Sequence, residues 1–444
     1  MMREEIKAQK TFWIASADMG YGHQRAVYPL RDIAEGGAII TVGSLQNNTD
    51  SEQKQWKRLL GIYELFSRAA SIKFIGKFIF GLLDTMLAIP SYYPMRNLSS
   101  PTLQTRMLVS TIKKGLSAGF LEKISSKKLP IITSFFAPAI AADMHGHDEV
   151  FCIICDADLN RVWVSENPFE SRITYFAPCA KAAQRLRLYG VPDSRIWVTG
   201  FPLPDELVGG TDMHILKKNL LRRLANLDPT GKFAARHGKS IEYFLGAVHT
   251  PELATGYLTI AYAIGGAGAQ AEIGFEIATS LKELIKAGKV KLIILAGVKT
   301  EINQEYKLFK QKEFGDSEYF EIVHHPELYP YFDLFNRAIA NVDVLWTKPS
   351  ELSFYTALGI PIIMSPALGS QEQFNKYWLF EITSGIKQLS PQYASSWLMD
   401  YLAIGRLADA AWAGFLKARK LGQYKIREIL EKGDTSDSDS PTER

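Results

Sequence analysis

Residues 257–270, YLTIAYAIGGAGAQ, decide the fold that this sequence predicts. An apolar run of strand length ends in a glycine-rich loop, and a helical pattern, AEIGFEIATSLKELI, follows it. The same order opens the chain, where TFWIASAD at 11–18 leads into MGYGHQ and then into AVYPLRDIA. A strand, a glycine loop and a helix in this order begin an open α/β unit. The two stretches therefore predict two such units in succession.

Further strand-like runs follow each beginning, with helical segments between most of them. In the first half they lie in GGAIITVGS and at 130–135, 149–156, 172–178 and 194–200. In the second half they lie at 290–298, 319–325, 342–348 and 360–366. Strands that alternate with helices are typical of a parallel, doubly wound sheet. The predicted fold class is α/β, with two doubly wound parallel-sheet domains.

Changes in composition suggest the domain boundaries. We expect an N-terminal domain at 1–205 and a hinge or linker at 206–245, near the glycine- and proline-rich GFPLPDELVGG. A C-terminal domain at 246–415, a C-terminal helix at 416–432 and a disordered polar tail at 433–444 complete the expectation.

A helical insertion at 51–95 interrupts the α/β pattern of the N-terminal domain. Basic side chains alternate there with aromatic ones, as in Lys57, Arg58, Phe66, Arg68 and Phe74. Such a segment can lie in a membrane interface and contact a lipid acceptor, or it can pack as a helix pair against the sheet. Both interpretations stay open.

Composition limits the classes of protein to which this chain can belong. The chain has 444 residues, a formal net charge of +4 and no zinc-finger or RNP motif, so we expect no nucleic-acid partner. Of the three cysteines, Cys152 and Cys155 lie in the strand-like run FCIIC, which predicts buried thiols in a reducing cytoplasm. No apolar run reaches the roughly 18 residues of a membrane span. We expect a cytoplasmic protein, with peripheral contact at the inner face of the membrane through 51–95 as the open alternative.

The first glycine loop carries a candidate base. Gly20, Gly22 and His23 follow the first strand and open a helix, at the carboxyl end of the sheet where open α/β folds bind ligands. A histidine there can accept a proton from an acceptor hydroxyl near neutral pH. It can equally cap the helix, and the spacing does not separate the two roles.

The second glycine loop is a candidate diphosphate site. Its residues are Gly265, Gly266, Gly268 and Gln270. Backbone N–H groups before a helix can hold a diphosphate, assisted by the helix dipole. No GK[ST] ends the loop, so it is not a Walker A motif, and its spacing departs from GxGxxG, which argues against an NAD enzyme.

Two further polar segments follow later strands. Ser350 and Glu351 lie in TKPSE, where they either bind nucleotide hydroxyls or phosphate, or simply cap and stabilise a helix. The next segment, GSQEQFN, supplies the polar groups Gly369, Gln371, Glu372 and Asn375. Amides and carboxylates are costly to bury without partners, and they suit sugar hydroxyls.

The ordered set of motifs resembles GT-B glycosyltransferases over roughly residues 11–380. The motifs are the first loop with its histidine, GGAGAQ, TKPSE, GIP and GSQEQFN, and the set is similar to monogalactosyldiacylglycerol synthases and to the GlcNAc transferase of the lipid-linked peptidoglycan precursor. The resemblance implies two Rossmann-like domains and a metal-independent transferase without cofactor. It places a nucleotide-sugar, a UDP-sugar by this likeness, on the C-terminal domain and an acceptor, with lipid as the leading candidate, on the N-terminal one.

The resemblance also implies residue roles. His23 aligns with the family's N-terminal histidine, the glycines and Gln270 with the diphosphate loop, and Gln371, Glu372 and Asn375 with the sugar-facing segment. The family's ribose-binding glutamate is replaced by Phe354, and Glu351 is the candidate substitute.

The acidic pair Asp156 and Asp158 forms a DxD pattern that we assign to the acceptor side or to structure, not to a metal. Asn160, Arg161 and Trp163 follow as further acceptor-side candidates. Two other functions remain open: a nucleotide-sugar 2-epimerase and a non-catalytic sugar-nucleotide-binding protein.

Overall fold

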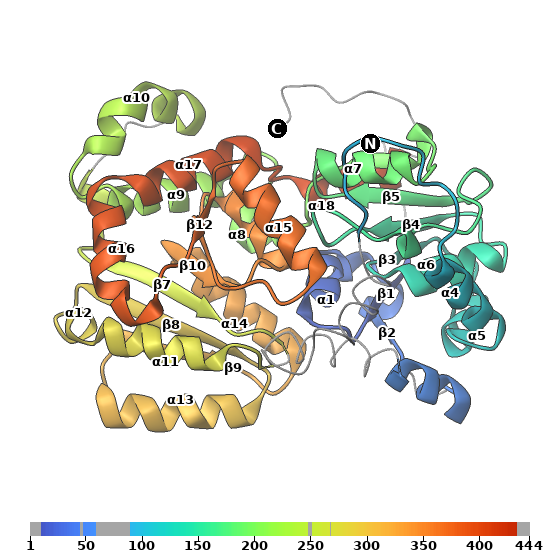
Figure 1. Ribbon diagram of the computed structural model, residues 1–444, viewed down its shortest axis with the longest axis horizontal. Helices are drawn as coiled ribbons and strands as arrows, with labels where there is room; N and C mark the ends of the chain where they lie inside the picture. Colours follow the sequence, from blue (N-terminus) through green and yellow to red (C-terminus); the bar gives the residue numbers. More distant parts are fainter. Residues whose placement is uncertain (1–9, 45–47, 59–88, 247–250, 267, 433–444) are drawn as a thin grey trace, which may run out of the picture. The chain divides into compact units, whose positions relative to one another are not determined.

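The structure is a computed structural model, described here for residues 10–44, 48–58, 89–246, 251–266 and 268–432. These residues form two compact units, each built on its own sheet (Figure 1). The first unit contains the described residues up to 202 together with 421–432, and the second contains those from 203 to 420.

The sheet of the first unit has six parallel strands in the order β2-β1-β3-β4-β5-β6. The strands are β1 (Trp13–Ala17), β2 (Ile40–Val42), β3 (Ile131–Thr133), β4 (Val150–Ile153), β5 (Ile173–Ala177) and β6 (Ile196–Val198). All five residues of β1 are buried, as are all five of β5. Strands buried on both faces favour apolar side chains at most positions, which explains the nearly continuous apolar runs in the sequence.

The helices of the first unit connect and cover these strands. They are α1 (Tyr21–Val27), α4 (Leu103–Lys113), α5 (Ala118–Ser125), α6 (Phe136–Met144), α7 (Ala180–Leu188) and α18 (Gly422–Lys432). Residues 50–58 are also helical, whereas most of the predicted insertion at 51–95 lies outside the described residues.

The second unit repeats this plan with the strand order β12-β11-β10-β7-β8-β9, again all parallel. Its strands are β7 (Leu258–Ala263), β8 (Val290–Gly297), β9 (Phe320–His324), β10 (Val344–Thr347), β11 (Ile362–Met364) and β12 (Gly385–Lys387). The predicted strands all overlap observed ones, and among the strands of the described residues only the edge strand β12 was not predicted.

The second unit has ten α-helices in the described residues. They are α8 (Asp205–Val208), α9 (His214–Leu227), α10 (Lys232–Leu245), α11 (Ala271–Ser280), α12 (Lys282–Lys286), α13 (Thr300–Glu313), α14 (Leu328–Ala340), α15 (Ser370–Glu381), α16 (Ala394–Ala403) and α17 (Arg406–Lys417). A 3₁₀ helix at Glu351–Leu358 replaces the α-helix expected after TKPS.

Each sheet has one point where the chain reverses its direction of winding. In the first unit β1 pairs with β2 on one side and β3 on the other, and in the second unit β7 lies between β8 and β10. Loops diverge at the carboxyl ends of such strands and leave a crevice, which is where open α/β sheets bind ligands. The two predicted glycine loops follow β1 and β7, so the topology places both of them at these switch points.

The predicted fold class, α/β with two doubly wound parallel-sheet domains, is confirmed in both units. The domain limits differ from those expected. Residues 206–245, predicted as a linker, form α8, α9 and α10 of the second unit. The cause is a buried anchor on α9: Arg223 donates from Nε to the Val342 carbonyl at 2.7 Å and from an η nitrogen to the Leu358 carbonyl at 2.8 Å.

The C-terminal helix α18 belongs to the first unit and not to the second, which it follows in sequence. Ile426, Ile429 and Leu430 are buried, and Arg427 makes a bidentate ion pair with Asp32 at 2.6 and 3.0 Å. Gly422 lies so close to Phe201 that an added Cβ would be 2.3 Å from the Phe201 carbonyl oxygen. The first unit is therefore made of two separate stretches of chain.

Candidate functional site

The loop after β1 places His23 beside the neighbouring strand β3. Gly20 has a φ of 96°, a backbone conformation that L side chains rarely adopt, and it lets the chain turn directly into α1. His23 lies on the first turn of that helix, and Ser134 follows β3. The hydroxyl of Ser134 donates to the His23 carbonyl at 2.6 Å, which ties the two loops together at the switch point.

The hydrogen bond made by the His23 ring selects its tautomer. Nδ1 lies 2.7 Å from the carbonyl oxygen of Ser134. A carbonyl can only accept, so Nδ1 carries the proton and, in the neutral ring, the lone pair resides on Nε2. His23 is thus held in the form in which a histidine acts as a base through Nε2.

Aromatic side chains surround this ring. Phe135 lies edge-on to His23 at a centroid distance of 5.0 Å, and Trp163 lies 5.9 Å away. Phe136 contacts both of these neighbours, at 4.3 and 5.3 Å. We call Phe135, Phe136 and Trp163 the aromatic wall. Trp163 was among the sequence candidates, whereas Phe135 and Phe136 were missed because nothing in the sequence showed that β3 neighbours β1.

The two residues of the acidic pair differ in their exposure to solvent. Asp156 is partly exposed, but Asp158 is fully buried, with its two carboxylate oxygens 2.7 and 2.9 Å from the guanidinium of Arg185. Both partners have no exposed side-chain surface. The acceptor-side assignment of Asp158 is therefore corrected: Asp158 neutralises a buried arginine, and a carboxylate with both oxygens so occupied serves the packing of α7.

Hydrogen bonds hold the glycine loop after β7 in place at the end that leads into α11. The Gly268 N–H donates to the Gly265 carbonyl at 2.7 Å, which closes a turn. Gln270 has a φ of 64° and accepts from the Tyr262 hydroxyl at 2.6 Å, and its side-chain amide donates to the Pro366 carbonyl at 2.8 Å. The Gln270 side chain thus fixes the loop to the segment after β11, and its backbone caps α11. Residue 267, inside the same loop, lies outside the described residues.

Two lysines lie beside this loop. A Cβ added to Gly265 would be 3.1 Å from Cε of Lys348, and one added to Gly268 would be 3.6 Å from Nζ of Lys299. Lys348 follows β10 directly and Lys299 follows β8, the two strands that flank β7. Backbone N–H groups, the N-terminus of α11 and the Lys299 ammonium therefore converge on one edge, an arrangement that favours anions, and the Lys348 ammonium lies there paired with Glu372. The sequence motif TKPSE contained Lys348, but only the strand order reveals its neighbour.

The segment after β11 meets the same edge. Glu372 pairs with Nζ of Lys348 at 2.5 Å and accepts from the Leu368 N–H at 2.7 Å. Gly369 caps α15, and Gln371 lies partly exposed in its first turn. Asn375 is fully buried and donates to the Pro349 carbonyl at 3.1 Å, so its predicted sugar-facing position is corrected to a link between two loops.

The contacts of the TKPSE segment show that it stabilises the helix that follows it. Ser350 caps the 3₁₀ helix by accepting from the Leu352 N–H at 3.4 Å. Glu351 is buried, with 8% of its surface exposed, and Phe354 packs against Trp378 at a centroid distance of 4.8 Å. Ser350 lies next to Lys348 at the switch point, so a ligand role remains a prediction for Ser350 and Glu351. Phe354 is a core residue.

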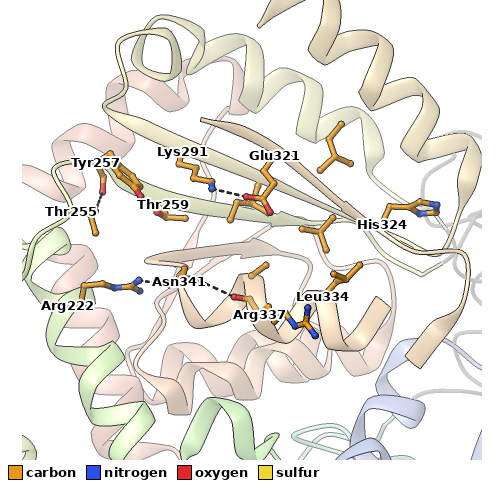
Figure 2. A pocket seen from close by; sticks show the side chains of 14 residues that line it. Arg222, Thr255, Tyr257, Thr259, Lys291, Glu321, His324, Leu334, Arg337 and Asn341 are labelled. Carbon is orange, nitrogen blue, oxygen red and sulfur yellow. Dashed lines mark hydrogen bonds and ion pairs between the residues drawn. The ribbon is translucent and has the colours of Figure 1, made fainter. Parts of the chain in front are cut away.

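One cavity lies apart from these loops. It measures about 590 Å³ and lies in the second unit between the sheet and α14 (Figure 2). None of the predicted site residues lines it. Among the residues that the structure describes, no three His, Cys, Asp or Glu side chains gather as a metal site, and no helix is both long and apolar enough to cross a membrane.

Sequence comparisons find no matching family model and no matching curated protein. Solved structures with a similar course of the chain include S. aureus MnaA with UDP (10% identity, 95% of this chain and 96% of that one, TM-score 0.47). UDP-GlcNAc 2-epimerase from Neisseria meningitidis, bound to UDP-GlcNAc, has 11% identity over 95% and 99% of the two chains and a TM-score of 0.45. The glycosyltransferase SnogD from Streptomyces nogalater has 10% identity over 95% and 99%, also with a TM-score of 0.45. These neighbours include both epimerases and transferases, and none of them assigns a reaction to this chain.

Proposed function

We propose that this protein is a glycosyltransferase that moves a sugar from a UDP-sugar to an acceptor hydroxyl. The observation that carries the proposal is the convergence at the β7 switch point of the glycine loop, the N-terminus of α11, Lys299 and Lys348. A leaving diphosphate gains negative charge in the transition state, and preorganised donors and cations at that position stabilise it. In the proposed reaction these groups do the work that a metal ion does in other transferases.

The first unit supplies the complementary group. His23 presents Nε2 as the basic nitrogen because Nδ1 donates to the Ser134 carbonyl. In the proposed mechanism it takes the proton from the acceptor hydroxyl as the new glycosidic bond forms. Phe136, the partly exposed member of the aromatic wall, suits an acceptor with an apolar surface, and a lipid with a free hydroxyl is the acceptor class that we propose.

A panel of UDP-sugars, incubated with the full chain with and without a hydroxyl-bearing lipid, tests the reaction. The proposal expects release of UDP that depends on the lipid. Isomerised donor without UDP release would show an epimerase, and binding with neither product would show a sugar-nucleotide-binding protein. Either result would overturn the transferase assignment.

A second experiment tests the diphosphate site by itself. Lys348→Gln should weaken UDP binding by about tenfold or more in calorimetry, because it removes an ammonium group from the loop. Lys286→Gln is the matched control: Lys286 is exposed and precedes β8, at the opposite edge of the sheet. Equal UDP affinity in both variants would contradict the proposed site.

A further inference from the structure

The cavity of about 590 Å³ in the second unit lies between one sheet face and α14, and Arg222 of α9 also lines it (Figure 2). In register, Thr259 pairs with Lys291 and Ile293 with Glu321, so these side chains share a face of the sheet. Leu334, Arg337 and Ala338, spaced by three and four residues on α14, form the facing wall. Its volume is within the range of about 300–1,000 Å³ that small-molecule sites occupy.

Basic groups exceed acidic ones in this lining. Arg222, Lys291 and Arg337 are cationic, and Glu321 is the carboxylate that lines the cavity with them. Glu321 is already paired with Lys291 at 2.8 Å. Arg222 lies 3.9 Å from the buried Asp343 carboxylate, so among these groups Arg337 carries the positive charge that remains for a ligand, and Arg222 adds hydrogen-bond donors.

Hydrogen-bond donors of both arginines remain unmatched within the described part of the chain. Arg337 lies at the rim, and its guanidinium makes no hydrogen bond or ion pair with any described residue. Arg222 donates to the Asn341 side chain at 3.0 Å and to the Ala340 carbonyl at 3.2 Å, while its Nε is buried without an acceptor. A buried donor without an acceptor carries a free-energy cost that a bound anion would relieve.

The rest of the lining mixes polar side chains, among them Thr255, Thr259 and His324, with apolar ones. Ile293, Val323 and Ala338 are buried residues that line the cavity, and Leu334 is partly exposed there. A ligand that satisfies both halves of the lining combines an anionic group with an apolar body.

We infer that this cavity is a second ligand site, for a small organic phosphate or carboxylate with an apolar or aromatic body. Arg337 and Arg222 bind the anionic group, and the side chains of β8, β9 and α14 contact the apolar part. The site lies on a sheet face, apart from the glycine loop at the carboxyl ends of the strands, and it does not depend on the proposed transferase function.

Calorimetry on the full chain with phenyl phosphate, benzoate and inorganic phosphate as probes tests the inference. At least one of the two aromatic probes should bind, and inorganic phosphate should bind about tenfold or more weakly because it leaves the apolar lining unused. Tighter binding of phenyl phosphate than of benzoate identifies the anionic group of the ligand as a phosphate, and the reverse order identifies it as a carboxylate. Equal affinity for inorganic phosphate, or no binding of either aromatic probe, overturns the inference.

Variants locate the probe. Arg337→Gln should weaken binding about tenfold, and Glu321→Gln should tighten it because a carboxylate leaves the lining. Arg106→Gln, which removes an exposed arginine of the first unit, should leave the affinity unchanged, as should Lys348→Gln at the glycine loop. An unchanged affinity in Arg337→Gln, or an equal loss in Arg106→Gln, would contradict the assignment.

Discussion

At the scale of single residues, His23 shows how a backbone carbonyl can prepare a side chain for chemistry. The Ser134 carbonyl holds the proton on Nδ1, and the aromatic wall restricts the ring. The base proposed here therefore needs no carboxylate partner to fix its tautomer. The loop between β3 and α6 performs that task.

His23→Ala should lower turnover with saturating donor by about 10²–10⁴-fold, the usual contribution of a general base. The dissociation constant for UDP should stay unchanged, because the diphosphate groups lie in the second unit. His145→Ala is a matched control, since its Nδ1 is also tied to a carbonyl, that of Ala141 at 2.8 Å. Turnover that survives in His23→Ala would remove His23 from the mechanism.

Gly268 offers a second test at a single position. Its φ is 80°, and an added Cβ would be 2.9 Å from Cδ1 of Ile302. Gly268→Ala should distort the loop and weaken UDP binding by about tenfold, as measured by calorimetry. Gly231→Ala introduces the same backbone strain, at a φ of 70°, where nothing lies within 4 Å. If the two variants bind UDP alike, the loop does not hold the diphosphate.

The sequence predicted the positions of His23 and of the second glycine loop because a strand, a loop and a helix leave a local pattern. Lys348, Lys299 and Phe135 were missed because their roles depend on which strands are neighbours. Asn375 was misassigned, and the role of Asp158 was left open between the acceptor side and structure, for the related reason that polarity alone does not distinguish a ligand-facing group from a buried one with a partner inside the chain.

At the scale of elements, α9 shows how buried polar contacts join a helix to a sheet. Asn226 donates to Oδ2 of Asp343 at 2.9 Å, and the same oxygen accepts from the Thr259 N–H at 2.9 Å. Arg223, on the same helix, is anchored to two carbonyls, and burial lowers its pKa to about 9. The sequence predicted a linker here because glycine and proline precede the helix, whereas the partners that retain α9 come more than a hundred residues later.

Asp343 makes the stability of this element depend on pH. Burial raises the pKa of its carboxyl from 3.8 to about 6. The folded state then binds a proton that the unfolded chain has lost, so its contribution to stability is present below pH 3.8 and is lost as the pH rises through 6.

The side chain in Asp343→Asn cannot ionise, so this variant should not lose that contribution to stability as the pH rises. Relative to the wild type, its free energy of unfolding should rise by up to about 3 kcal/mol between pH 4 and 7, as measured by urea denaturation. Asp316→Asn, at an exposed position, should show no such trend. A difference that is independent of pH at position 343 would refute the assigned ionisation.

At the scale of the whole molecule, each unit can be tested for its own stability. A chain ended at residue 420 lacks α18 and loses the buried side chains of Ile426, Ile429 and Leu430 from the first unit. We expect the first unit to lose on the order of 5 kcal/mol, since each buried aliphatic side chain contributes about 1.5–3 kcal/mol.

Calorimetry should show this truncation as a transition that moves to lower temperature while that of the second unit stays in place. A chain ended at residue 432 keeps α18 and is the control. A transition of the first unit at the same temperature in both chains would show that α18 does not stabilise it.

The position of α18 also bears on the order of events at the ribosome. Residues 421–432 are synthesised after every residue of the second unit, yet they complete the first. Domains usually fold as they emerge, beginning from the N-terminus. Here the half that is translated first must wait for its last helix, so the later half can reach its finished structure earlier.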